Sequence, residues 1–274
     1  MPTDAIRVNG SFPSTELLIP FGLLLNFGLV LCRMTGILTF LPLPGLRAGF
    51  ELHRLALAVL FTVLVLPWTE TAKTPLVSLS DIVRTAGSEA ALGIGLGLCV
   101  ALVQEGLQLA AQMIGLQAGF SYASTIDPTS NADSAILQVL LTLGSSLLFL
   151  ALGFDTVLFK FLLLGVQTVP PGQWAISTQH VGAVMALFPQ LFIDAIRCSL
   201  PVVAILLLID TALALLSRMQ PQLQMLSMSF PLKMLASMVF LAYGTPLLPA
   251  AVERAALRSL ETMQFLMATP TGVK

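Results

Sequence analysis

Charged side chains that lie inside or beside long apolar runs are the residues whose chemistry is most in question. They are Arg33, Glu89, Glu105, Asp155, Lys160, Asp194, Arg197, Asp210, Arg218 and Lys233. A charge at the centre of a bilayer costs at least ~2.5–3.5 kcal/mol, so such groups normally face protein or water. Asp194 and Arg197 are three residues apart and can pair on one helix face. Two interpretations stay open, a proton or ion relay and structural pairs inside a larger complex, and the residues favour the second.

No other group of side chains in the sequence has the spacing of a reactive site. Cys32, Cys99 and Cys198 lie in apolar runs without a CxxC or Cys/His spacing, and we expect them to pack as small hydrophobes. His53 and His180 have no partner at ligand spacing. A nucleophile–base constellation and a Walker loop are both missing from the sequence. We therefore predict no enzyme, no metal site and no cofactor.

The composition predicts an all-α membrane protein. Of 274 residues, 56% are hydrophobic and only 10% are charged, and the mean hydropathy is +0.92. A soluble domain carries about 25% charged residues, so too few charges are present to cover a water-facing surface. The formal net charge of −1 gives no electrostatic reason to expect nucleic acid as a partner.

Six apolar runs are candidates for membrane-spanning helices, each of which needs ~20 mostly apolar residues. The runs are 17–41, 52–68, 86–116, 135–168, 181–217 and 231–250. The runs 135–168 and 181–217 exceed one straight span, so we expect a bent helix or a hairpin in each. Pro20, Pro189, Pro201 and Pro246 are expected to kink the helices that contain them.

Two further patterns concern packing. Gly87, Ala91 and Gly95 recur on one helix face and predict close helix packing, and Gly93 with Gly97 forms a second stripe. Five methionines surround a segment at Ser229-Phe230-Pro231 that we expect to be broken: Met219, Met225, Met228, Met234 and Met238. Core packing is the default interpretation of these methionines, and a deformable seal around a passing chain is the alternative.

The stretch from Gly115 to Ser134 contains no Lys or Arg and joins two apolar runs. Gly115 and Gly119 are expected to weaken helix continuation, and Asp127-Pro128 favours a turn. A plain external loop and a re-entrant or pore-facing loop are both open interpretations, since irregular backbone at membrane depth needs protein or water around it.

Several of these segments together resemble one family. Arg218, Pro221 and Gln222, followed by Pro231-Leu-Lys233, resemble the RxxPQLxxxxxxxPLK signature of the FliR family of flagellar and type III secretion export proteins. The Gly115-to-Ala123 stretch that ends at Asp127-Pro128 is similar to that family's GxxxGxxxA…DP element. Further similarities lie at Arg33 with Gly36, in the turn Pro42-x-Pro44-Gly45 and in the helix from Leu55 to Pro67. The resemblance covers about residues 17–265.

The resemblance implies a non-enzymatic export-gate subunit at the base of the flagellum or injectisome, in the bacterial inner membrane. Its implied partners are the P, Q and B subunits (the FliP, FliQ and FlhB families) and unfolded secreted substrates. The implied fold consists of kinked and broken helical hairpins, with a P-like part at 1–180 and a Q-like part at 181–274 that ends in a polar tail. A stand-alone transporter of small solutes or ions is the alternative.

The resemblance also assigns residues. It implies a plug or gating loop near 115–127, with Gly115, Leu116, Gln117, Gly119, Phe120, Tyr122, Asp127 and Pro128. It implies buried pairs or assembly contacts for Arg33, Glu89, Asp194, Arg197, Asp210, Arg218 and Lys233. The small residues Gly87, Ala91 and Gly95 would pack helices.

Overall fold

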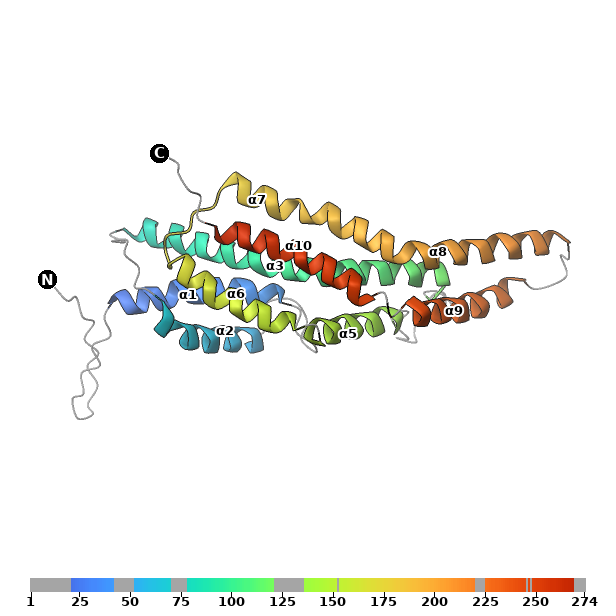
Figure 1. Cartoon of the computed structure of the whole chain (residues 1–274), viewed down its shortest axis with the longest axis horizontal. Coiled ribbons are helices and arrows are strands. Elements are labelled where there is room, and N and C mark those ends of the chain that lie inside the picture. Colours follow the sequence, from blue (N-terminus) through green and yellow to red (C-terminus); the bar gives the residue numbers. More distant parts are fainter. Residues whose placement is uncertain are drawn as a thin grey trace. The chain divides into compact units, whose positions relative to one another are not determined.

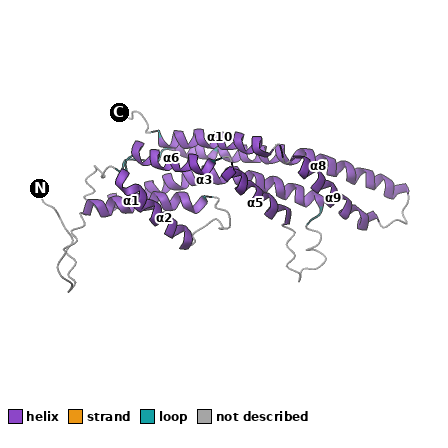
Figure 2. Ribbon diagram, turned by 60° about the horizontal axis from the view of Figure 1, so that its bottom comes forward, coloured by secondary structure: helices purple, strands orange, loops and turns teal. Residues whose placement is uncertain are grey.

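The computed structural model describes residues 21–41, 52–69, 78–120, 136–151, 153–219, 225–244, 246 and 248–268, and every regular element in this part of the chain is a helix (Figure 1). In chain order they are α1 (Phe21–Phe40), α2 (Leu52–Val65), the 3-10 helix η1 (Leu66–Trp68), α3 (Leu79–Ala118), α5 (Ile136–Ala151), α6 (Phe154–Thr168), α7 (Thr178–Met185), α8 (Leu187–Met219), α9 (Met225–Gly244) and α10 (Leu248–Met267). Figure 2 shows the same elements as helices throughout. The predicted all-α membrane fold is confirmed.

Three helical stretches of the described chain are long and apolar enough to cross a membrane: Gly22–Phe40, Leu79–Ala118 and Thr178–Met219, the last of which joins α7 and α8. A fourth is possible if α9 and α10, which meet at a bend of 66°, count as one broken span. At ~1.5 Å per residue, α3 is roughly 60 Å long, about twice the ~30 Å hydrocarbon core of a bilayer. Parts of α3 must therefore extend beyond that core or tilt strongly within it.

The helix boundaries correct several of the sequence expectations. The run 52–68 gives only the 14 residues of α2 and a short η1, too short for a span. The run 135–168, in contrast, is interrupted as expected: it breaks between α5 and α6 at Gly153, whose φ of +72° suits glycine. Pro189 lies in the first turn of α8, so it is not expected to kink the helix. The N–H groups of the first turn make no intrahelical hydrogen bond, and proline there removes none.

The segment at Ser229-Phe230-Pro231 is not broken, so that prediction is wrong. α9 runs without interruption from Met225 to Gly244 with Pro231 inside it. Proline removes one intrahelical hydrogen bond, and the leucines and methionines around it are good helix formers that keep the helix continuous. α8 likewise continues through Pro201.

The described residues pack as two units. Unit 1 takes them from Met1–Val100, Asp155–Val184 and Leu260–Lys274, and unit 2 from Ala101–Phe154 and Met185–Ser259. The predicted P-like and Q-like halves concern similarity to other subunits, and this grouping by packing leaves them a prediction.

The core of unit 1 forms where α1 packs on α2 and α3. Its fully buried side chains include Val30, Met34 and Ile37 of α1 and Leu92 of α3. A side chain of α2 also closes one end of α1: the Nη1 atom of Arg54 donates to the carbonyls of Leu38, Thr39 and Leu41. The last carbonyls of a helix lack intrahelical donors, so Arg54 caps α1.

Glycines bring the backbones of α1 and α3 together. A Cβ at Gly36 would lie 2.8 Å from the carbonyl oxygen of Ala90, and one at Gly97 would lie 2.7 Å from that of Ile37. A Cβ at Gly93 would overlap the carbonyl of Arg33. The second small-residue stripe therefore makes the tightest helix contact. Of the first stripe, Gly95 touches side chains only, and nothing lies within 4 Å of a Cβ at Gly87.

In unit 2, α8 packs on α9, and both cover the end of α3. Ile114 and Ala118 of α3 and Val202 and Leu206 of α8 form a buried apolar cluster, against which Phe240 of α9 packs. This cluster holds the end of α3 in place within the unit.

Replacing Gly93 by Ala is expected to lower the melting temperature of the purified protein, because the new Cβ would force α1 and α3 apart. Overpacking of this kind typically costs about 1–3 kcal/mol. Gly87→Ala is the matched control on the same helix, where alanine gains about 1 kcal/mol of helix propensity without a clash. Thermal unfolding in detergent measures both variants, and equal shifts would contradict the close contact at Gly93.

Candidate functional site

A buried ion pair lies at the centre of unit 1. Nε of Arg33, on α1, donates to Oε2 of Glu89, on α3, at 2.6 Å, and the two side chains are 3% and 0% exposed. Both residues fall inside helices long enough to cross a membrane. The pair therefore joins two spans through their charges, at positions that neither water nor lipid reaches.

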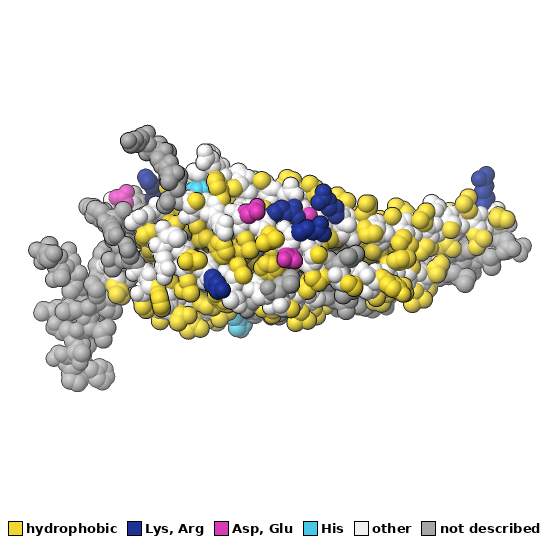
Figure 3. Space-filling view, in the orientation of Figure 1, with side chains coloured by type: hydrophobic (Ala, Val, Ile, Leu, Met, Phe, Trp, Pro, Cys, Tyr) yellow, Lys and Arg dark blue, Asp and Glu magenta, His cyan; other side chains and the backbone are white. Residues whose placement is uncertain are grey.

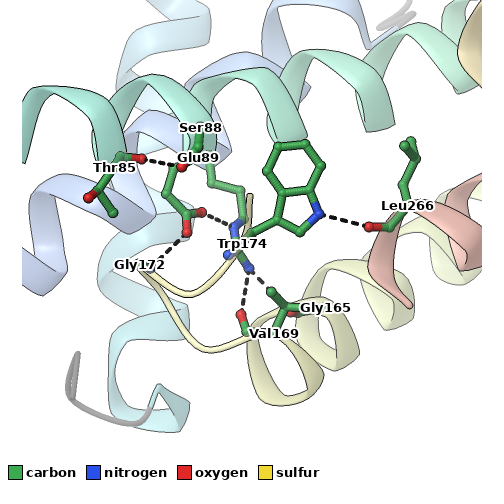
Figure 4. Close-up of polar contacts among 9 residues, drawn as sticks. Thr85, Ser88, Glu89, Gly165, Val169, Gly172, Trp174 and Leu266 are labelled. Atoms are coloured by element: carbon green, nitrogen blue, oxygen red, sulfur yellow. Dashed lines mark hydrogen bonds and ion pairs between the residues drawn. The ribbon is translucent and has the colours of Figure 1, made fainter. Parts of the chain in front are cut away.

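The same two side chains also hold the segment around the end of α6. Nη1 of Arg33 donates to the carbonyls of Gly165 at 3.2 Å and Val169 at 3.1 Å. The other carboxylate oxygen of Glu89 accepts the backbone N–H of Gly172 at 2.8 Å. Figure 4 shows Glu89 directed toward the turn at Gly172, with Gly165 and Val169 close by. One ion pair thus links α1, α3, the end of α6 and the turn that follows it.

The surroundings explain how two charges tolerate this burial. Removing an ion from water costs several kcal/mol, which only a partner charge and further hydrogen bonds can offset. The carbonyls at a helix C-terminus carry partial negative charge, so the end of α6 suits the Arg33 guanidinium. Nη2 of Arg33 is the one nitrogen of this group without a hydrogen-bond partner in the described structure.

An aromatic group that the sequence analysis did not single out extends this site. Nε1 of Trp174 donates to the carbonyl of Leu266 at 3.0 Å (Figure 4). The Trp174 ring stacks on His180 with centroids 5.1 Å apart, and His180 meets the edge of Phe265 at 5.8 Å. These contacts attach the last turns of α10 to unit 1. The available signal in the sequence was a tryptophan two residues after Pro170-Pro171-Gly172.

A second polar group lies at the C-terminal end of α3, in unit 2. Asp210 of α8 accepts a hydrogen bond from Nε2 of Gln117 at 3.0 Å and forms an ion pair with Nζ of Lys233, of α9, at 3.0 Å. The ring of Phe230 occupies the space beside Gly119, 2.6 Å from where a Cβ would lie. We call Gln117, Gly119, Asp210, Phe230 and Lys233 the α3-end cluster.

The helix end itself has a defined form. The N–H of Phe120 bonds to the carbonyl of Gly115 at 3.1 Å, and that of Gly119 to Leu116 at 3.2 Å, while Gly119 has a φ of +82°. This pair of bonds is a Schellman motif, which ends helices at a left-handed glycine. Gly115 therefore does not weaken the helix, contrary to expectation, and Gly119 ends it. Tyr122, Asp127 and Pro128 lie outside the described residues.

Asp194 pairs with a different arginine from the one expected. Its carboxylate accepts from Nη2 of Arg258, on α10, at 2.8 Å and 3.0 Å, and Nη1 of Arg258 bonds to Gln190 at 2.9 Å. The Asp194–Arg197 pair is thus a wrong prediction, because Arg258 on the facing helix α10 reaches both carboxylate oxygens of Asp194. Arg197 instead lines a cavity.

Several of the remaining predicted residues are exposed. Arg218 is exposed in the last turn of α8, where a positive charge suits the helix dipole. Met219 and Met238 are exposed, so core packing inside this chain does not describe them. Among the described residues, no group of three His, Cys, Asp or Glu side chains is placed to hold a metal ion.

Long apolar helices, two of which are joined by a buried ion pair, define this chain as an all-α membrane protein. Residues 24–258 match the family described as bacterial export proteins, family 1. The flagellar biosynthetic protein FliR of Bacillus subtilis (strain 168) is 30% identical over 88% of this chain and 94% of its own length. The FliR of Pectobacterium carotovorum is 29% identical over 81% of this chain and 84% of its own.

The surface presentation of antigens protein SpaR of Salmonella typhimurium is also similar, at 27% identity over 81% of this chain and 84% of its own length. The chain belongs to the FliR family of bacterial export proteins. It is therefore a membrane-associated component of the flagellar and type III protein-export apparatus.

Glu89→Gln is expected to destabilise unit 1 by about 3–5 kcal/mol, because it leaves the Arg33 charge buried without a partner. Asp194→Asn is the matched control, since the Asp194–Arg258 side chains are 24% and 34% exposed and such pairs contribute about 0–1 kcal/mol. Thermal or denaturant unfolding in detergent measures both. A smaller effect of Glu89→Gln than of Asp194→Asn would show that the buried pair is not structural.

Proposed function

We propose that this chain is a subunit of the export gate at the flagellar base in the bacterial inner membrane. There it helps to form and close a channel for unfolded export substrates, together with P, Q and B subunits of the FliP, FliQ and FlhB families. The observation that carries the proposal is the α3-end cluster, which fixes the start of the segment expected to plug the channel. Membership of the export family and the names of the relatives support it.

The exposed apolar surface supports assembly with other subunits. Figure 3 shows hydrophobic side chains over much of one face, with several charged side chains grouped near its middle and a few others scattered toward its ends. The apolar stretch Thr178–Met219 buries little of its surface inside the chain. Large exposed apolar patches mark contacts with protein or lipid. Because α3 exceeds the thickness of the bilayer core, other subunits are the natural neighbours of its outer parts.

The α3-end cluster suits a gate because its contacts are reversible. The side chains of Lys233 and Asp210 are 12% and 36% exposed, so water reduces the strength of their attraction. Gln117 and Gly119 belong both to this cluster and to the expected plug segment, 115–127, so the cluster holds the first residues of that segment. Release of Asp210 from Gln117 and Lys233 would remove the polar contacts of the last turn of α3 and so loosen the start of the plug segment, while Ile114 and Ala118 stay packed in the core of unit 2.

The alternative, a stand-alone transporter, needs an acidic group that takes up and releases protons. Glu89, Asp194 and Asp210 are the candidates, and each forms an ion pair, at 2.6, 2.8 and 3.0 Å. Three carboxylates fixed by cations favour structural use of these charges over a proton relay. The structure of the described chain thus gives more support to the gate proposal.

Lys233→Met in the assembled gate is expected to raise the leak of small ions across proteoliposomes, because Asp210 loses the cation that holds it. The lost pair contributes about 1 kcal/mol at most, which corresponds to about a fivefold shift toward the open form. Lys160→Met is the matched control, since Lys160 is exposed on α6 and outside the α3-end cluster. The ion flux of the Lys233→Met and Lys160→Met complexes is measured with an ion-sensitive dye.

Deletion of residues 115–127 is expected to raise the same leak further, since it removes the plug segment itself. If the deletion left the permeability of the assembled complex unchanged, the plug assignment would be wrong. The chain alone, reconstituted without P and Q subunits, is expected to give no flux. Solute or proton flux by the lone chain that is lost in Asp210→Asn would favour the transporter instead.

A further inference from the structure

Unit 2 contains a cavity of about 450 Å³ between α3, α8, α9 and α10. Its size falls within the ~300–1,000 Å³ of typical ligand pockets. Small residues from three of the helices leave this space open: Ala110, Ala111, Gly244, Ala250 and Ala251. The remaining wall is mostly aliphatic or aromatic, with Leu107 of α3 and Phe240 of α9 among its residues. The interior of the cavity is therefore suited to an apolar group.

Two arginines also line this cavity. Arg197 of α8 and Arg254 of α10 are both exposed, and neither forms an ion pair in the described part of the chain. Nε of Arg254 donates to the carbonyl of Ala250 in its own helix at 3.0 Å. Asp194, the acidic group one helical turn from Arg197 and Cys198, is already paired with Arg258. Within the described residues, these two positive charges at an apolar cavity thus have no ion-pair partner.

Pro201 adds an acceptor at the same place. Proline has no backbone N–H, so the carbonyl of Arg197, four residues earlier, loses its intrahelical donor. A ligand for this site therefore combines an apolar body, a negative charge and, close to that charge, a group that donates a hydrogen bond.

We propose that this cavity binds an anionic phospholipid from the surrounding bilayer, with one acyl chain inside and its phosphate between Arg197 and Arg254. Guanidinium groups bind phosphate through paired N–H donors, and basic pockets between membrane helices bind anionic headgroups. A flexible acyl chain can follow an irregular cavity. A helix is about 10–12 Å across with its side chains, so this cavity would hold only about one turn of it. The acyl chain would fill the cavity that the small side chains of unit 2 leave open.

The test compares lipids with the same acyl chains and different headgroups. The full chain, purified in detergent, is incubated with phosphatidylglycerol or with phosphatidylcholine, and native mass spectrometry counts the lipid retained. We expect phosphatidylglycerol to be retained in preference to phosphatidylcholine. Retention is measured on the isolated chain, so the result is independent of whether the chain forms a channel.

Variants separate the charge from the cavity. Arg197→Gln with Arg254→Gln is expected to lower phosphatidylglycerol retention about twenty-five-fold, at about fivefold for each arginine. Lysine at both positions keeps the charge and is expected to restore most of it. Ala111→Trp fills the cavity and is expected to abolish retention with both arginines present. Arg84→Gln, an exposed arginine of α3 that does not line the cavity, is the control and is expected to leave retention unchanged.

Equal retention of the two lipids by the unmodified chain would overturn the proposal. So would retention at the unmodified level in either the double glutamine variant or Ala111→Trp. The melting temperature of each variant shows whether it is folded. A variant that has lost its fold would melt at a lower temperature and lose both lipids, whereas the loss of the arginine charges alone would reduce only the preference for phosphatidylglycerol.

Discussion

The buried Arg33–Glu89 ion pair is the interaction on which unit 1 depends. It lies where α1 and α3 come closest, next to glycines whose missing side chains let the two backbones meet. The close approach keeps water away from the charges and so strengthens their attraction. The charges in turn hold the end of α6 and the turn at Gly172. The glycine contact and the ion pair therefore support each other at the same place.

The chain holds two kinds of polar group with different energetic character. The pair in unit 1 is fully buried, and breaking it would leave a charge stranded at a cost of several kcal/mol. The α3-end cluster in unit 2 is partly exposed, and its ion pair contributes at most about 1 kcal/mol. The first is suited to permanent structure and the second to an element that moves. This difference supports the proposed gating role of the end of α3.

Sequence reasoning identified the fold class and the unusual charges, because composition and apolar runs depend on local residue types. It identified Arg33 and Glu89 separately but not as partners, since 56 residues separate them. It paired Asp194 with Arg197 for the opposite reason, since only local spacing was visible and Arg258 was 64 residues away. The sequence also favoured Gly87 and Gly95 as the glycines of close helix packing, although Gly93 and Gly97 are the ones that lie against α1. Which of two similar stripes is buried depends on the neighbouring helix, which a single sequence does not specify.

The central claim is that the exposed apolar helices of this chain end against other subunits of an export gate. The most direct measurement is the mass and composition of the complex that an affinity-tagged chain brings out of the membrane in mild detergent. The account predicts a complex of fixed stoichiometry that contains P and Q subunits. Recovery of the chain as a lone species surrounded only by lipid and detergent, from cells that express all gate subunits, would contradict it.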